Sequence, residues 1–201
     1  GTLIKSVDII LETYHEVMQT YFKDVDMEKE DVTAFLGYPL IDSFKKYTTD
    51  LSLIDEVIKQ YRIRTKERMT SELEAYPNAK KIIEWLKNKK IKVGIVTSKT
   101  TSVALDNLKT VGLNDLFDCF IGMEDCVKHK PDPEGILKAL EVLNAKNEET
   151  VYIGDHENDI IAAKKAGVLS CGVTYSYRLG EVLAAMPDFV IDELSNIKDL
   201  I

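Results

Sequence analysis

Positive charge is outnumbered by negative charge in this sequence and is not gathered into a basic stripe. The 201 residues carry 26 Lys and Arg against 34 Asp and Glu, which gives a formal net charge of −8. Nucleic-acid-binding domains need clustered positive charge, so this balance argues against a nucleic-acid partner. The densest basic run, residues 80–92, is interpreted as the solvated face of a helix and its exit turn.

Cysteine is scarce, and the three cysteines are Cys119, Cys126 and Cys171. An odd number without a C-x-x-C pair favours reduced thiols in a cytoplasmic protein. Each cysteine lies in or beside an apolar run, which is typical of a small buried residue rather than a reactive one.

Long apolar runs are absent, and none approaches the ~20 residues that a helix needs to span a membrane. We therefore expect no membrane partner, while monomer and homodimer both remain open. Apolar residues still make up 45% of the chain. That is enough for a sizeable core, in one domain with an insertion or in two small domains.

Residues 8–76 contain no convincing strand pattern. Apolar residues recur there at helical spacing in three stretches, 11–21, 40–44 and 54–61. We interpret this region as a small all-helical domain.

From residue 77 onward, short apolar strands alternate with helices. The expected strands are 92–96, 119–121, 151–153, 170–173 and 189–191. The expected helices include one that has Pro77 in its first turn, one at 101–111, one at 133–143 with Leu137 facing inward, and one at 158–166. This alternation predicts an α/β fold with a three-layer, Rossmann-like core, in which helices cover both faces of a parallel sheet. The core would comprise residues 1–7 and 77–201, with the helical domain 8–76 inserted.

Polar side chains follow three strands of the predicted sheet. Thr97 and Ser98 follow the first strand, Lys130 follows the second after a short loop, and Asp155 and Asp159 follow the third. Because the carboxyl ends of parallel strands share one edge, these groups can converge. A lysine offers a compact positive charge to phosphate oxygens, and carboxylates are ligands that Mg²⁺ prefers. The set therefore predicts a site for a phosphate and its metal.

Taken singly, each of these groups has a simpler explanation. A Thr-Ser pair after a strand usually caps a helix, a Lys-Pro pair usually lies in a surface turn, and an Asp after a strand is often an N-cap. Their occurrence together, in this order and at these strand ends, favours the phosphate site.

Four segments carry a resemblance to a known family. They are Gly1-Thr2-Leu3, Ile95-Val96-Thr97, Lys130-Pro131-Asp132-Pro133, and Gly154-Asp155 with Asp159. In this order they resemble the motifs of the haloacid dehalogenase superfamily, in the subgroup with a helical cap inserted after the first strand. The tail, residues 151–201, looks most similar to bacterial phosphoglycolate phosphatases and related pyrophosphatases.

The resemblance implies a Mg²⁺-dependent phosphatase that acts on pyrophosphate or on a small phosphorylated metabolite such as phosphoglycolate. One aspartate would attack phosphorus to form an aspartyl-phosphate, and a second would protonate the leaving group and activate water. Thr97 would bind the transferring phosphoryl group and Lys130 would neutralise its charge. Asp155 would bind the metal directly, with Asp159 in support. Contacts to phosphate or substrate are further expected from Gly1, Thr2, Ser98 and Tyr38.

Two of the implied groups need separate mention. Both reactive aspartates of the family motif would precede Gly1, on a central strand, so we expect the natural protein to begin several residues upstream. Tyr38 belongs to a segment that resembles the substrate-facing cap loop, although a plain turn before a helix explains it equally well.

Other functions remain open on this scaffold. A phosphomutase is possible, although Thr2 is the phosphatase-like residue at its position. A metal-free dehalogenase would lack the carboxylate that Asp155 provides. A non-catalytic binding or regulatory protein would follow if Gly1 were the true start. The substrate is not fixed by the sequence, because cap loops set it and vary freely on one fold.

Overall fold

The computed structural model describes residues 1–26, 35–36 and 39–201 of the chain. They form two compact units, one made of Lys5–Glu74 and the other of Gly1–Ile4 with Ala75–Ile201. The sequence pattern put the corresponding boundaries between residues 7 and 8 and between residues 76 and 77. In the described part of the chain, no helix combines the length and the apolar character needed to cross a lipid bilayer.

The smaller unit is built from helices. Its described helices are α1 (Val7–Tyr21), α3 (Leu40–Phe44) and α4 (Leu51–Glu72). Asp50 caps α4, because its carboxylate accepts hydrogen bonds from the amides of Ser52 and Leu53. The helices enclose an aromatic core in which Tyr14 stacks on Phe44 with their ring centroids 5.3 Å apart. Tyr38 lies outside the described residues, so the prediction for it stays a prediction.

The larger unit contains five short parallel strands. They are β1 (Gly94–Val96), β2 (Cys119–Ile121), β3 (Val151–Gly154), β4 (Leu169–Val173) and β5 (Phe189–Ile191). β1 pairs with β2, and β4 lies between β3 and β5. The first strand begins two residues later than predicted, because the Val93 amide is taken by the Asp118 carboxylate instead of a neighbouring strand.

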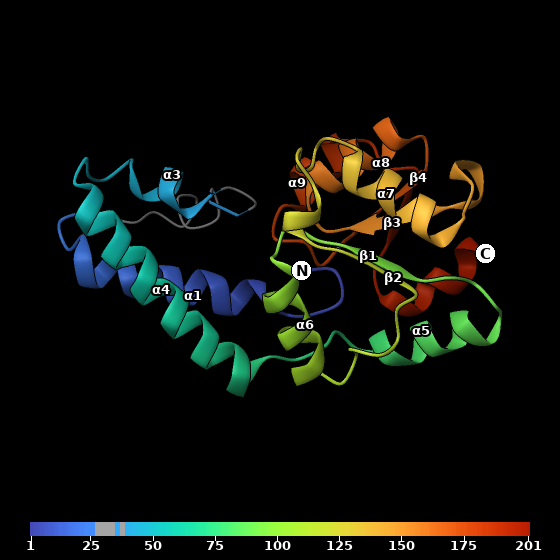
Figure 1. The fold of residues 1–201 in the computed structure, drawn as a ribbon, viewed down its shortest axis with the longest axis horizontal. Helices are drawn as coiled ribbons and strands as arrows, with labels where there is room; N and C mark the ends of the chain where they lie inside the picture. Colours follow the sequence, from blue (N-terminus) through green and yellow to red (C-terminus); the bar gives the residue numbers. More distant parts are fainter. Residues whose placement is uncertain (27–34, 37–38) are drawn as a thin grey trace. The chain divides into compact units, whose positions relative to one another are not determined.

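Helices cover both faces of these strands (Figure 1). The layer on one face includes α5 (Ala79–Asn88) and the 3-10 helix η3 (Leu194–Leu200), and the other includes α7 (Glu134–Leu143) and α8 (Glu157–Ala166). The remaining elements are α6 (Thr101–Thr110), α9 (Leu179–Ala184), η1 (Met123–Asp125) and η2 (Asn147–Glu149). Strand alternation separates the two cores, since Ile153 packs with α5 and Tyr152 packs with α8. The predicted parallel α/β fold is therefore confirmed.

Two details of the prediction are wrong. Pro77 precedes its helix instead of lying in the first turn, because Asn78 takes a left-handed conformation (φ 65°) and the helix begins at Ala79. Leu137 was expected to face inward but is 45% exposed. The buried stripe of α7 runs through Ile136 and Leu140, and Leu137 lies one helical step, about 100°, away from it.

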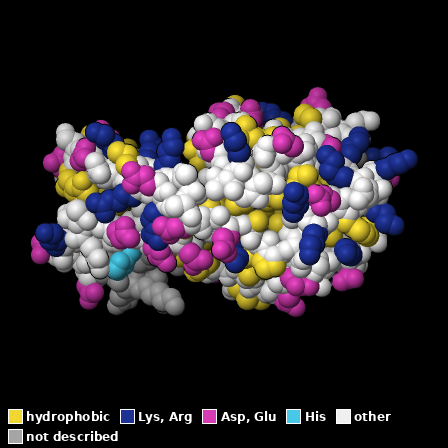
Figure 2. All heavy atoms as spheres, turned by 90° about the horizontal axis from the view of Figure 1, so that it is seen from below, with side chains coloured by type: hydrophobic (Ala, Val, Ile, Leu, Met, Phe, Trp, Pro, Cys, Tyr) yellow, Lys and Arg dark blue, Asp and Glu magenta, His cyan; other side chains and the backbone are white. Residues whose placement is uncertain are grey.

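The charged surface agrees with the absence of a basic stripe from the sequence. On the face shown in Figure 2, Lys and Arg occur close to Asp and Glu and do not form a separate patch.

Candidate active site

The site lies where β3 ends. Gly154 closes the strand, and a Cβ at this position would lie only 2.2 Å from the Cβ of Asp159. Glycine is therefore needed here, because it lets the first turn of α8 fold back against the strand. His156 caps α8, as its Nδ1 accepts a hydrogen bond from the Asn158 amide at 3.1 Å. Asp155 is held between the strand and the helix, at the carboxyl edge of the sheet.

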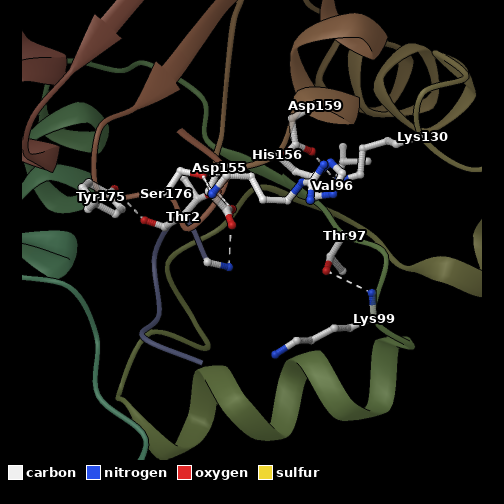
Figure 3. A network of polar contacts seen from close by, with 12 residues as sticks. Thr2, Val96, Thr97, Lys99, Lys130, Asp155, His156, Asp159, Tyr175 and Ser176 are labelled. Atoms are coloured by element: carbon white, nitrogen blue, oxygen red, sulfur yellow. Dashed lines mark hydrogen bonds and ion pairs between the residues drawn. The ribbon is translucent and has the colours of Figure 1, made fainter. Parts of the chain in front are cut away.

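Asp155 is fixed by contacts to both its side chain and its main chain (Figure 3). Its Oδ1 accepts the Thr2 hydroxyl at 2.7 Å and lies 3.4 Å from the main-chain nitrogen of Gly1. The Ser176 hydroxyl donates to its carbonyl at 2.5 Å, and the Tyr175 hydroxyl donates to the Thr2 carbonyl at 2.8 Å. Segments from the beginning and the end of the core therefore hold one carboxylate in place.

The environment keeps Asp155 ionised. Burial by itself would raise the pKa of this carboxyl. The Thr2 hydroxyl and the charge of Lys130 act in the opposite direction and lower the pKa. The carboxylate is therefore charged at neutral pH.

Lys130 and Asp159 form a buried ion pair. Lys130 Nζ lies 2.7 Å from Asp159 Oδ1, and the two side chains are only 16% and 8% exposed. The second carboxylate oxygen of Asp159 accepts the His156 amide at 3.1 Å. Burial would lower the pKa of Lys130, but Asp159 and Tyr152 raise it, so the lysine stays protonated. Both oxygens of Asp159 are thus occupied by positioning contacts.

Tyr152 joins this pair to the neighbouring strand. Its hydroxyl accepts from Lys130 Nζ at 3.2 Å and donates to the Val96 carbonyl at 3.1 Å. Burial raises the pKa of Tyr152 to about 12, so the group is a neutral phenol. An ammonium has three N–H donors, and Asp159 and Tyr152 occupy two of them. Within the described residues the third has no protein partner and can meet a phosphoryl oxygen.

The turn after β1 contributes the hydroxyl. The Thr97 amide donates to the Ile121 carbonyl at 2.9 Å, and Thr97 Oγ1 accepts the Lys99 amide at 3.2 Å. A small cavity of ≈ 20 Å³ lies beside it, with Thr97, Ser98, Cys126 and Lys130 among its lining residues. The volume suits about one water molecule.

The predicted residues thus form two linked groups. One contains Gly1, Thr2 and Asp155, and the other contains Lys130 and Asp159. Their roles toward phosphate and metal stay predictions, as does any role for Ser98, which is exposed.

The sequence reasoning did not find three further groups of the site. Tyr152 was hidden within an apolar strand, Lys99 stood beside Thr97 without a motif of its own, and Ser176 follows a strand to which no chemistry was assigned. Only Lys99 carried a local signal, as a charged residue next to a predicted phosphate-binding turn.

Asp155 has the chemistry for a divalent cation. Its Oδ2 has no hydrogen-bond partner within the described residues, and Mg²⁺ commonly binds through one or two carboxylates plus waters and substrate phosphates. Among those residues no group of three or more His, Cys, Asp or Glu side chains is placed to hold a metal ion. Waters and substrate phosphates would have to supply the other ligands. Asp155 therefore fits the metal role more directly than Asp159 does.

Comparison with known proteins gives a consistent family. A family model described as haloacid dehalogenase-like hydrolase matches residues 1–173. A pyrophosphatase PpaX from Anoxybacillus flavithermus is 35% identical over 202 residues, covering 100% of this chain and 93% of the relative. A Clostridium perfringens protein assigned as a pyrophosphatase PpaX is 38% identical over 205 residues, with the same coverage.

Solved structures share the fold. A Bacteroides fragilis protein assigned as a haloacid dehalogenase-like hydrolase aligns with a TM-score of 0.83 at 30% identity, over 98% of this chain and 94% of that one. A Thermotoga maritima protein assigned as a β-phosphoglucomutase aligns with a TM-score of 0.81 at 26% identity, over 100% and 96% of the two chains. The prediction of a phosphatase enzyme is confirmed by the sequence relatives. The chain belongs to the haloacid dehalogenase-like hydrolase family.

Proposed function

We propose that the protein is a Mg²⁺-dependent phosphatase that hydrolyses pyrophosphate or a small phosphorylated metabolite of the phosphoglycolate kind. The observation that carries this proposal is the arrangement at one sheet edge of a protonated, rigidly held Lys130, the Thr97 hydroxyl and the ionised Asp155. The pyrophosphatase relatives support pyrophosphate as a substrate, and the resemblance to phosphoglycolate phosphatases supports the ester.

Each residue has a distinct role in the proposed reaction. The free N–H of Lys130 and the Thr97 hydroxyl contact the oxygens of the transferring phosphoryl group and are positioned before substrate arrives. Asp159 and Tyr152 act on Lys130 by fixing its direction. Asp155 would hold Mg²⁺, which when bound supplies positive charge to the phosphoryl oxygens. By the family resemblance, two aspartates would serve as the nucleophile and the acid–base group, and the intermediate would be an aspartyl-phosphate.

We further propose that residues 8–76 act as the cap that selects the substrate, with Tyr38 on its substrate-facing loop. A cytoplasmic location accords with the three free thiols. The division of the chain into two compact units supports an inserted domain.

The proposed function is tested by phosphate release from the full-length natural protein. Pyrophosphate, phosphoglycolate and p-nitrophenyl phosphate are offered with Mg²⁺, and then with excess chelator. We expect hydrolysis that stops in chelator and returns when Mg²⁺ is added. Asp155→Asn should lower the rate and raise the Mg²⁺ concentration needed, because the ligand loses its charge.

A matched control is available in the same sheet. Asp192 also follows a parallel strand, and its carboxylate accepts the Thr174 hydroxyl at 2.9 Å, but it is exposed and lies at the end of β5. Asp192→Asn should leave both the rate and the Mg²⁺ requirement unchanged. Full activity in chelator, or equal effects of the two substitutions, would refute the proposed metal role of Asp155.

A further inference from the structure

Lys99 is a cation at the site that has no ion-pair partner among the residues that the structure describes. Its amide donates to Thr97 Oγ1 and its carbonyl accepts the Met123 amide at 2.9 Å, so its main chain is fixed on both sides. Figure 3 shows its side chain running beneath Thr97, with the ammonium end turned toward the side on which Thr2 and Asp155 lie. Within the described part of the chain, no carboxylate forms an ion pair with this ammonium.

Lys99 is half-buried, so its ammonium is only partly solvated. Burial lowers the pKa of Lys99 to about 8, although the charge of Asp155 acts in the opposite direction. A desolvated cation without a counter-charge is unfavourable, and an anion that binds beside it relieves this cost. Lys99 is therefore prepared for an anionic ligand.

Two other basic groups near this edge already have carboxylate partners. Lys130 is bound to Asp159 at 2.7 Å. Arg178 makes two hydrogen bonds to the Glu157 carboxylate, at 2.9 and 2.6 Å. Lys99 thus differs from both in having a charge that remains to be balanced.

We propose that Lys99 binds the second anionic group of the substrate, which is the departing phosphate of pyrophosphate or the carboxylate of a phosphorylated acid. The inference rests on the proposed function, in which Thr97 and Lys130 contact the transferring phosphoryl group. The hydrogen bond from the Lys99 amide to Thr97 ties the two contacts together, since both belong to one turn. Lys99 therefore selects doubly anionic substrates over simple aryl phosphates.

The test compares Lys99→Met with Lys99→Arg and with Lys109→Met. Lys109 is an exposed lysine on the following helix, α6, so its substitution makes the same change in net charge away from the site. The values of kcat and KM are measured for pyrophosphate and for p-nitrophenyl phosphate at saturating Mg²⁺, and thermal unfolding verifies the fold of each variant. In parallel, calorimetry measures binding of the non-hydrolysable methylenebisphosphonate and of inorganic phosphate.

In Lys99→Met, the ratio of kcat/KM for pyrophosphate to that for the aryl phosphate should fall by about 10- to 100-fold, the range for a lost hydrogen bond to a charged group. In the same variant, the affinity for methylenebisphosphonate should fall more than the affinity for phosphate. Lys99→Arg should restore most of the kcat/KM ratio, and Lys109→Met should leave that ratio unchanged. An unchanged ratio, whether both activities fall together or neither does, would overturn the assignment.

The binding measurement keeps this test independent of the proposed function. If the natural protein hydrolyses none of the substrates, the proposed function fails. The role of Lys99 is then tested by calorimetry alone. If Lys99→Met lowers the affinities for methylenebisphosphonate and phosphate equally, or lowers neither, the proposed role is refuted.

Discussion

Replacing Lys130 with methionine removes the ammonium of the buried ion pair while keeping an unbranched side chain of similar length. The Asp159 carboxylate, 8% exposed, then keeps only the His156 amide as a donor. Breaking a buried pair in this way costs about 3–5 kcal/mol. Because the His156 amide still donates a hydrogen bond to Asp159, we expect a loss at the lower end of this range, about 3 kcal/mol. Phosphatase activity should fall together with stability, by about 10²-fold or more, because a preorganised donor to the phosphoryl group is lost.

Lys138→Met provides the matched comparison. Lys138 Nζ lies 2.7 Å from Glu134 Oε1, the same separation, but the side chains are 42% and 22% exposed. Water screens this pair, and Glu134 also accepts the amides of Val127 and Lys128. The variant should unfold at nearly the same urea concentration as the unmodified protein.

Urea unfolding at pH 7, followed by the fluorescence of the single Trp85, reports on the core unit. The pKa of Lys130 is raised in the folded state. The contribution of Lys130 to the free energy of unfolding is therefore fully present below the unfolded-state pKa of lysine and is lost only as pH rises above that value. Neutral pH therefore measures the whole effect. Equal midpoints for Lys130→Met and Lys138→Met would refute the argument that burial, and not distance, sets the strength of these pairs.

Three further changes can be checked with the same unfolding assay. Tyr152→Phe keeps the ion pair but removes two hydrogen bonds, so it should cost about 1–2 kcal/mol. Gly154→Ala places a Cβ 2.2 Å from that of Asp159 and should cost about 2 kcal/mol or more; normal stability would show that the turn relaxes freely. Ser170→Ala removes a 2.6 Å hydrogen bond to Asp188, whose pKa is lowered chiefly by this bond. Its destabilising effect should be present at neutral pH and should shrink as pH falls below about 4, where the carboxyl becomes protonated. An effect independent of pH would contradict that reading.

Much of the fold could be predicted because its signals are local. Each strand was marked by a short apolar run, and each helix by its period, so the alternation predicted a parallel sheet without knowledge of any contact. The same rule predicted that Thr97, Lys130 and Asp155 come close together, since each follows a parallel strand; in the structure these strands belong to a two-stranded sheet, β1-β2, and a three-stranded sheet, β3-β4-β5.

The details that escaped prediction depend on contacts between distant parts of the chain. Tyr152 looked like a packing residue of β3, yet its hydroxyl reaches the carbonyl of Val96, 56 positions earlier. The late start of β1 depends on Asp118, 25 positions after Val93. Leu137 was misplaced for a different reason, because a helix with apolar residues in succession has more than one plausible buried stripe, and only the neighbouring elements decide between them.

The charge balance of the site connects the proposed metal with the proposed role of Lys99. Asp159 cancels the charge of Lys130, so this pair would bind phosphate through one directed N–H more than through net attraction. Asp155 then leaves negative charge where a phosphate anion must enter. Mg²⁺ on Asp155 would make the local charge positive where the transferring phosphoryl group binds. Lys99 would supply positive charge where the second anionic group binds. A substrate with two anionic groups therefore needs both cations, whereas an aryl phosphate needs chiefly the metal.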